Sequence, residues 1–291
     1  MTLANLYALA AVALWASLAS LGLALAHLPP FFLTGGALII GGALALPAAV
    51  TQPARWTLPL PALALGVCTL FGFHFLLFMA LRLAPAVEVN LVNYLWPLFI
   101  VVLAPLYLRD LHWRGHHVVA ALLGFAGAAL AIVGAAGSVA GAGVELAGAG
   151  VWAGYAMALA SALIWANYSL QSKRLALAGR GFHTAAVGLF GLVSGALSLL
   201  CHWALEPAVT LSSRDGWLLL ATGLGPLGAA FYLWDRALKL GDPRHIGLLS
   251  YITPLASTAL LLLVAGRGLS WSVALAAALI VSAALLGLRK G

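Results

Sequence analysis

The sequence contains very little charge. Only 7% of its 291 residues are Asp, Glu, Lys or Arg, whereas 64% are hydrophobic. Soluble domains carry about 25% charged residues, so this composition excludes a protein that covers itself with a water-facing surface. Segments of about 10 residues with strict apolar and polar alternation, typical of transmembrane barrels, are also missing. Because backbone groups in lipid must be hydrogen-bonded within their own segment, we expect an all-α polytopic membrane protein.

Cysteines and acidic residues are scarce as well, with two of the former and seven of the latter. Cys68 and Cys201 both fall in apolar stretches, where we expect small buried side chains, and two cysteines define neither a disulfide framework nor a metal site. The acids are scattered, and no paired-carboxylate, HExxH or serine–base set is present. We therefore predict no catalytic residue, no metal and no cofactor, and an intramembrane enzyme is a distant alternative. Charged rings and repeated carbonyl filters, which would favour a passive channel, are absent too.

Long apolar runs fill most of the chain. A helix that crosses a membrane needs about 20 predominantly apolar residues. The first run lacks the basic start of a secretory leader, so we interpret it as a helix of the mature protein. Ten spans lie between polar breaks, at residues 3–25, 30–50, 58–81, 86–108, 115–137, 148–172, 182–204, 215–238, 243–265 and 270–288.

The formal charge of +7 is explained by its distribution among the loops, without a nucleic-acid partner. With the amino terminus in the cytoplasm, three basic residues lie outside and the rest inside, as the positive-inside rule requires. The sequence therefore predicts a membrane protein with both termini cytoplasmic. The outer residues are Arg82, Arg214 and Arg267, and the inner ones are Arg55, Arg109, Arg114, Lys173, Arg174, Arg180, Arg236, Lys239, Arg244, Arg289 and Lys290.

The two halves of the chain resemble each other. A shift of 157 residues places ALRL (80–83) on ALKL (237–240) and YLWPL (94–98) on YITPL (251–255), and a shift of 150 aligns Trp15 with Trp165. Residues 1–140 and 141–291 would then each hold five helices. Because five is odd, the second half enters the membrane from the opposite side, which is the inverted-repeat plan of many transporters. We expect a 5+5 inverted repeat around a central cavity.

These features resemble those of a known protein family. The ten spans, the paired five-helix halves and the segment ALRLAPAVEVNLVNYLWPLF (80–99) resemble EamA-type members of the drug/metabolite transporter superfamily, and the aromatic placement resembles the YddG-type aromatic amino-acid exporters. The resemblance implies a bacterial inner-membrane protein that exports aromatic and other mostly neutral amino acids across the lipid bilayer by alternating access, as a monomer. Another small amphipathic metabolite or drug is the alternative substrate.

Two matching segments interrupt their own apolar helices with proline. In the fourth span Asn90, Asn93, Tyr94 and Pro97 share one helix face, since they stand at i, i+3, i+4 and i+7. The ninth span repeats this face with Gly247, Ser250, Tyr251 and Pro254. Each proline removes the bond to the carbonyl four residues earlier, so we expect free carbonyls at Asn93 and Ser250 near the membrane midplane. The alternative is a pair of kinked helices packed without a ligand.

Aromatic stripes with polar edges accompany these faces in the third, sixth and eighth spans. Such stripes are often simple packing, but buried Trp N–H and Tyr O–H groups need partners, which favours a cavity. We predict that Asn93 and Ser250 bind a zwitterion whose side chain lies on aromatic rings. The candidate substrate-binding residues are Asn93, Tyr94, Trp96, Ser250, Tyr251, Trp15, Trp165, Tyr168, His74, Phe78 and Tyr232, and the candidate gating residues are Pro97 and Pro254.

Three further patterns predict structure rather than chemistry. TGLGPLG (222–228) contains GxGxxG, but it lies in a span with Pro226 and without the βαβ context of a nucleotide site, so it predicts close helix packing. HWRGHH (112–117) places His112 and His116 at metal-binding spacing, but with no further ligand nearby it predicts a basic interfacial loop. Asp242 followed by Pro243 predicts a helix start.

Overall fold

The computed structural model describes residues 2–139, 149–264 and 271–287. Within those ranges every regular element is helical. The elements are α1 (Leu3–Ala16), α2 (Leu18–Ala24), α3 (Pro30–Ala43), α4 (Leu46–Thr51), η1 (Pro53–Arg55), α5 (Leu60–Leu83), α6 (Ala86–Asn93), α7 (Trp96–Tyr107), α8 (Gly115–Val139), α9 (Ala149–Leu177), η2 (Thr184–Ala186), α10 (Val187–Leu205), α11 (Ser213–Leu224), the π-turn η3 (Gly225–Ala229), α12 (Ala230–Leu240), α13 (Pro243–Leu249), α14 (Ile252–Val264) and α15 (Trp271–Gly287).

The helices are long and apolar enough for a multi-pass membrane protein. Among the described residues, five helical stretches reach membrane-spanning length, and three further apolar helices are shorter. The predicted span 30–50 is interrupted, because α3 ends at Ala43 and a separate helix, α4, follows. Cys68 is exposed and Cys201 half-buried, so the prediction of two buried cysteines is wrong. The long stretches are Leu3–Ala24, Leu60–Leu83, Glu88–Tyr107, Thr184–Leu205 and Ser213–Leu240.

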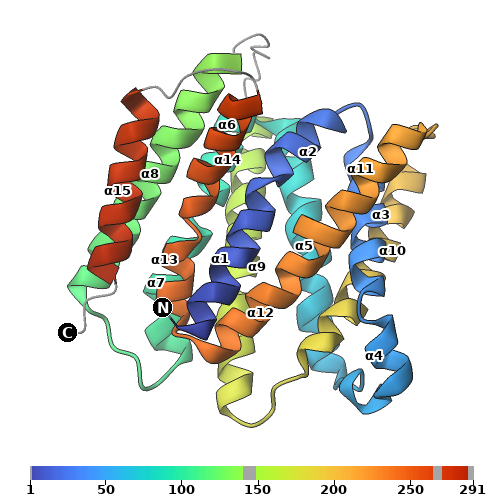
Figure 1. The fold of residues 1–291 in the computed structure, drawn as a ribbon, viewed down its shortest axis with the longest axis horizontal. Helices are drawn as coiled ribbons and strands as arrows, with labels where there is room; N and C mark the ends of the chain where they lie inside the picture. Colours follow the sequence, from blue (N-terminus) through green and yellow to red (C-terminus); the bar gives the residue numbers. More distant parts are fainter. Residues whose placement is uncertain (1, 140–148, 265–270, 288–291) are drawn as a thin grey trace.

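Helices from the two halves of the chain pack in pairs. α1 packs on α12, α3 on α10, α5 on α9, and α8 on α15. Figure 1 shows α8 and α15 at one side of the bundle, α3 and α10 at the other, and α1 and α9 between them. The largest hydrophobic core extends from the middle helices to α3 and α10, and it includes Phe190, Trp234 and Leu238. The start of α1 and the end of α15 lie at the same end of the bundle (Figure 1).

Two helices break where proline interrupts them. α6 ends at Asn93 and α7 starts at Trp96, and in the same way α13 ends at Leu249 and α14 starts at Ile252. Each proline lies in the first turn of the new helix, where its missing N–H is tolerated. The backbone N–H of Thr253 donates to the carbonyl of Ser250 at 2.9 Å. The prediction of a free carbonyl at Ser250 is therefore wrong, because the tighter turn provides the N–H of Thr253 as a donor to the carbonyl that Pro254 cannot bond.

Glycines bring α3 against the eighth predicted span. A Cβ on Gly41 would lie 2.6 Å from Cα of Gly228, and one on Gly223 would lie 2.8 Å from the carbonyl oxygen of Ala37. These approaches exclude any side chain, so Gly223 and Gly228 of the GxGxxG segment mediate helix contact, whereas a Cβ on Gly225 would make only an ordinary contact with Leu14. Between them, residues 225–229 form a π-turn, which suits the missing N–H of Pro226.

Helix ends follow simple capping rules at the end of the bundle where α9 and α12 finish. Gly179 adopts φ +67°, and the N–H of Arg180 donates to the carbonyl of Leu175, which is the glycine-terminated ending that many helices share. Asp242 accepts a hydrogen bond from the backbone N–H of Arg244 and α13 begins at Pro243, so the predicted helix start is confirmed.

Candidate functional site

A cavity of about 340 Å³ lies inside the bundle, between helices of both halves. Its volume falls in the range of small-molecule sites, which are about 300–1,000 Å³. The wall is mostly apolar, with polar side chains at a few points, as expected for a site that binds an amphipathic molecule. It is lined by Trp15, Leu18, Gly22, Leu33, Thr34, Phe73, His74, Leu77, Phe78, Asn90, Asn93, Tyr94, Trp96, Trp165, Thr222, Leu227, Phe231 and Thr253.

The fourth span contributes more polar side chains to the cavity wall than any other span. Asn90, Asn93, Tyr94 and Trp96 line the cavity around the break between α6 and α7. The Asn93 amide donates from Nδ2 to Oγ of Ser161 on α9 at 2.7 Å. That hydroxyl donates in turn to a backbone carbonyl of its own helix. Because Ser161 uses one of the two amide hydrogens, the rotamer of Asn93 is fixed while its carbonyl oxygen has no partner among the described residues.

His74 presents an acceptor to the same cavity. Its Nδ1 lies 2.6 Å from the carbonyl oxygen of Leu70, one turn earlier in α5. Since a carbonyl only accepts, we assign the hydrogen to Nδ1, which leaves Nε2 as an acceptor in the neutral ring. The ring packs against Phe73 and Phe231. His74 can therefore accept a hydrogen bond from a ligand N–H.

Four indole rings close one end of the cavity. Trp15, Trp96, Trp165 and Trp234 stand with neighbouring ring centroids 5.2 to 6.5 Å apart; we call this set the tryptophan layer. The first three line the cavity, and Trp234 is fully buried behind them. The indole N–H of Trp15 donates to the carbonyl of Pro226 at 3.1 Å. The irregular π-turn thus supplies the acceptor that orients this ring.

Seven of the predicted substrate-binding residues line this cavity and four do not. Ser250 and Tyr251 lie beside the break between α13 and α14 but are fully buried, and neither reaches the cavity wall. Tyr168 packs against Trp165, and Tyr232 donates its hydroxyl to the carbonyl of Gly41 at 2.9 Å. The gating candidates Pro97 and Pro254 are also outside the lining. The seven that line it are Asn93, Tyr94, Trp96, Trp15, Trp165, His74 and Phe78.

The orientation of Tyr251 has a specific cause. A Cβ on Gly124 of α8 would lie 2.3 Å from the Tyr251 ring, so the ring occupies the space that this glycine leaves. The aromatic residue is thereby drawn toward α8, away from the cavity. From the ninth span, the cavity is lined by Thr253 instead.

Several lining residues were not among the sequence candidates. Thr34 and Thr222 are buried single threonines in apolar helices, and no pattern marks them. Asn90 shares the helix face of Asn93, and Phe231 corresponds to His74 by the shift of 157 residues, so both carried a usable signal.

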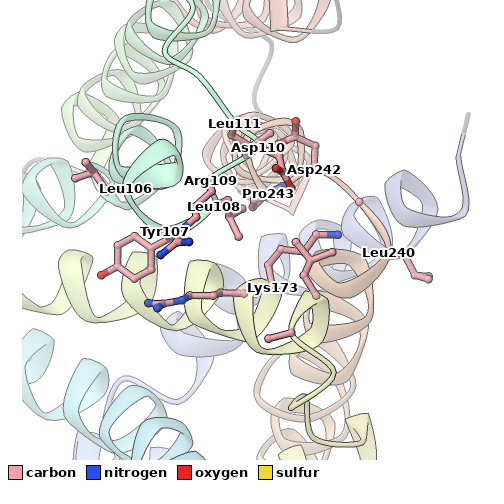
Figure 2. Close-up of a pocket in the computed structure, with 14 residues that line it drawn as sticks. Leu106, Tyr107, Leu108, Arg109, Asp110, Leu111, Lys173, Leu240, Asp242 and Pro243 are labelled. Carbon is pink, nitrogen blue, oxygen red and sulfur yellow. The ribbon is translucent and has the colours of Figure 1, made fainter.

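A second cavity of about 730 Å³ lies near the ends of α7, α9 and α12. Figure 2 shows Tyr107 and Arg109 directed from the end of α7 toward α9, which carries Lys173. The Tyr107 hydroxyl donates to Oδ1 of Asn167 at 2.8 Å. The residues that line this cavity are Leu106, Tyr107, Leu108, Arg109, Asp110, Leu111, Lys173, Arg174, Leu177, Ala178, Leu240, Gly241, Asp242 and Pro243.

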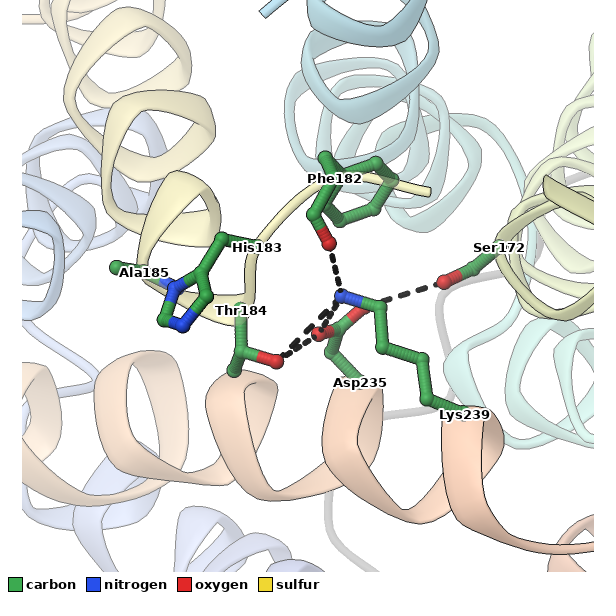
Figure 3. Close-up of polar contacts among 7 residues, drawn as sticks. All are labelled: Ser172, Phe182, His183, Thr184, Ala185, Asp235 and Lys239. Atoms are coloured by element: carbon green, nitrogen blue, oxygen red, sulfur yellow. Dashed lines mark hydrogen bonds and ion pairs between the residues drawn. The ribbon is translucent and has the colours of Figure 1, made fainter. Parts of the chain in front are cut away.

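A buried ion pair ties the helices together at this end. Lys239 Nζ lies 2.6 Å from a carboxylate oxygen of Asp235, which is fully buried. Hydroxyls of Ser172 and Thr184 donate to the same carboxylate, and Lys239 also donates to the carbonyl of Phe182 (Figure 3). Buried charges are tolerated when paired and hydrogen-bonded in this way. The network links α9, α12 and the segment before α10.

The described residues contain no group of three or more His, Cys, Asp or Glu side chains placed to hold a metal ion. The two cavities and the networks around them are thus built from hydrogen-bonding, aromatic and charged side chains. What they offer a ligand is binding and orientation.

Comparison with known proteins gives a consistent result. The sequence profile of the EamA-like transporter family matches residues 2–133 and again residues 152–289. The aromatic amino acid exporter YddG of Ancylobacter novellus is 38% identical over 287 residues, which cover 97% of this chain and 95% of that protein. A crystal structure superposes with a TM-score of 0.87 at 37% identity, covering 98% of this chain and 97% of the other.

Proposed function

Because the chain belongs to the EamA-like transporter family, which is a family of transporters and not of enzymes, we propose that it exports amino acids across the bacterial inner membrane by alternating access. The substrates are aromatic and other mostly neutral amino acids. Support comes from the 38% identical relative, which is an aromatic amino acid exporter. The protein works as a monomer in the lipid bilayer.

The proposed architecture is ten spans in two inverted five-helix repeats, residues 1–140 and 141–291. The helix pairs support it. If the first span corresponds to the sixth and the third to the eighth, the repeat symmetry maps the α1–α12 pair onto the α9–α5 pair. The α3–α10 and α8–α15 pairs then each join two equivalent spans. This exchange is what a pseudo-two-fold axis in the membrane plane requires. The boundary at residues 140 and 141 lies outside the described residues.

Both termini are cytoplasmic in the proposed orientation, because most loop cations then lie inside. The 340 Å³ cavity is lined from Gly22 in the second part of the first span, Thr34 at the start of α3 and Phe78 near the end of α5. In this orientation it lies toward the outer face, and the tryptophan layer separates it from the cytoplasm.

The side chains of the cavity wall are the main support for this proposed function. Indoles of Trp15, Trp96 and Trp165 provide flat apolar surface for an aromatic side chain. On the same wall, the carbonyl oxygen of Asn93 and Nε2 of His74 are acceptors that suit an ammonium group. A zwitterion with an aromatic side chain uses both kinds of surface.

Uptake into liposomes that contain the purified protein tests this function. The panel consists of phenylalanine, tryptophan, tyrosine, threonine, glutamate and lysine. We expect saturable uptake of the aromatic and neutral members, and phenylalanine uptake to be inhibited by excess tryptophan. A panel in which no amino acid enters faster than into empty liposomes would return the protein to the alternative of another small amphipathic metabolite or drug.

A further inference from the structure

The cavity of 730 Å³ at the ends of α7, α9 and α12 is lined by more positive than negative charge. Arg109, Lys173 and Arg174 contribute three cations, whereas Asp110 and Asp242 contribute two acids. Asp242 is already paired with Arg244 at 2.6 Å. Within the described residues neither Arg109 nor Arg174 has an ion-pair partner, and both are exposed. Unpaired guanidinium groups in a cavity favour a ligand that carries a carboxylate.

This cavity and the smaller one share the lining helices α7, α9 and α12. α7 contributes Trp96 to the small cavity and Tyr107 to the large one, and α9 contributes Trp165 and Lys173 in the same way. At 1.5 Å per residue these steps along the helices are roughly 12–16 Å. The two cavities are therefore successive along one axis, and the tryptophan layer lies between them.

Two sets of contacts lie between the small cavity and the large one. The tryptophan layer forms the floor of the small cavity, and the Tyr107–Asn167 hydrogen bond lies at the wall of the large one. Lys173 donates to the carbonyl of Lys239 at 3.1 Å, so the large cavity also adjoins the buried ion pair. Separation of α9 from α7 and α12 would join the cavities into one passage.

We propose that the large cavity is a cytoplasmic vestibule that binds the amino-acid zwitterion before it reaches the central cavity. Arg109, Arg174 and Lys173 bind its carboxylate, and Asp110 on the same wall binds its ammonium group. This inference rests on the proposed function and adds a second binding site to it, at the end from which an exporter takes its substrate.

Protection of a cysteine at the vestibule tests the binding directly. The background variant carries Cys68→Ala, Cys201→Ala and Ala178→Cys, since Ala178 is exposed and lines the cavity. Inside-out vesicles are treated with a membrane-impermeant maleimide over a range of L-phenylalanine concentrations. We expect phenylalanine to slow labelling severalfold, and phenethylamine, which lacks the carboxylate, to have no effect.

Charge variants identify the residues that bind. Arg109→Gln combined with Arg174→Gln should raise the half-protecting phenylalanine concentration about tenfold, as expected when charge-assisted hydrogen bonds are lost. Arg180→Gln is the matched control, because Arg180 is an exposed arginine in the loop that follows α9 and lies outside the lining. Unchanged protection in the double variant, or an equal loss in the control, overturns the vestibule.

A central-cavity variant separates this inference from the proposed function. Asn93→Ala lies in the other cavity and should leave vestibule protection intact while it weakens transport. Protection that disappears in Asn93→Ala would mean that labelling reports the central site, and the vestibule proposal would then be wrong. Failure of the proposed function itself appears elsewhere, as absent uptake into liposomes.

Discussion

At the scale of single residues, Asn93 and Ser250 occupy matching positions in the two halves but have different surroundings. Asn93 lines the cavity and holds Ser161 with one amide hydrogen. Ser250 is fully buried, and its hydroxyl donates to the carbonyl of Gly247 within its own helix. A ligand in the cavity can therefore contact Asn93 and not Ser250.

The first prediction compares these two residues. Asn93→Ala should raise the KM for phenylalanine roughly tenfold, because a hydrogen bond to a charged ligand group is lost. Ser250→Ala should change this KM less than twofold. Liposome uptake measured at equal protein content checks both variants. Equal effects of the two substitutions would contradict the assignment of Asn93 to the site.

The second prediction concerns Asp242 at the start of α13. Burial alone would raise the pKa of this carboxyl, but hydrogen bonds and charge from Arg244 hold the pKa below its ordinary value of 3.8. The ionised form is thus favoured in the folded protein. Its contribution to stability is present above the ordinary pKa and is lost as the pH falls through the lower, folded pKa.

Asp242→Asn keeps a good helix cap and removes the charge opposite Arg244, which is only 8% exposed. At pH 7 we expect the midpoint of thermal unfolding in detergent to fall by about 2–4 °C. The difference between variant and parent should shrink below about pH 4. A difference that stays constant down to pH 3 would show that the charge of Asp242 does not stabilise the fold.

At the scale of helices, the interruptions were predictable and the rotations were not. Proline with preceding polar residues indicated breaks before Pro97 and Pro254, and the helices are broken there. The internal repeat gives the position along a helix, but the direction of a side chain depends on which neighbour leaves room. Gly124 of α8 leaves space for the Tyr251 ring, and the sequence of the ninth span alone does not indicate this.

Close packing of α3 leads to the third prediction. A Cβ on Gly41 would lie 2.5 Å from the carbonyl oxygen of Leu227, and these are backbone atoms that cannot turn aside. Gly41→Ala should therefore destabilise the protein by about 1–3 kcal/mol through overpacking. Gly216→Ala on α11 is the control, since a Cβ there meets nothing within 4 Å and alanine favours helix.

Thermal unfolding in detergent measures both glycine variants. A stable Gly41→Ala protein would mean that α3 and the π-turn can move apart without cost. That result would also remove the reason for glycine in the GxGxxG segment.

At the scale of the whole molecule, the sequence predicted the class of protein and a central cavity, but not the full set of residues that line the cavity. Low charge, long apolar runs and the repeat predicted a helical membrane transporter, because these properties can be read directly from the sequence. The cavity is made by contacts between distant segments, such as Trp15 with Pro226 and Asn93 with Ser161. Such partners depend on how helices are turned against each other, which composition and spacing do not specify.

The fourth prediction concerns the driving force of transport. Asp235 is the acid that is fully buried in the described spans, and it is paired with Lys239 and hydrogen-bonded to two hydroxyls. These partners occupy the carboxylate oxygens of Asp235, so we interpret it as part of a structural ion pair and not as a proton carrier. We expect phenylalanine to move down its own gradient at a rate unaffected by a pH difference across the liposome membrane. A rate that rises severalfold with an imposed pH gradient would require proton coupling.

The tryptophan layer also gives the protein an optical property of its own. Four indoles with neighbouring centroids 5.2 to 6.5 Å apart are close enough for their electronic transitions to couple. The near-ultraviolet circular dichroism of the unlabelled protein should therefore contain an exciton signal from this cluster. If α9 separates from α7 and α12 during transport, the coupling between the indoles falls steeply with distance. The exciton signal should therefore change while substrate is transported.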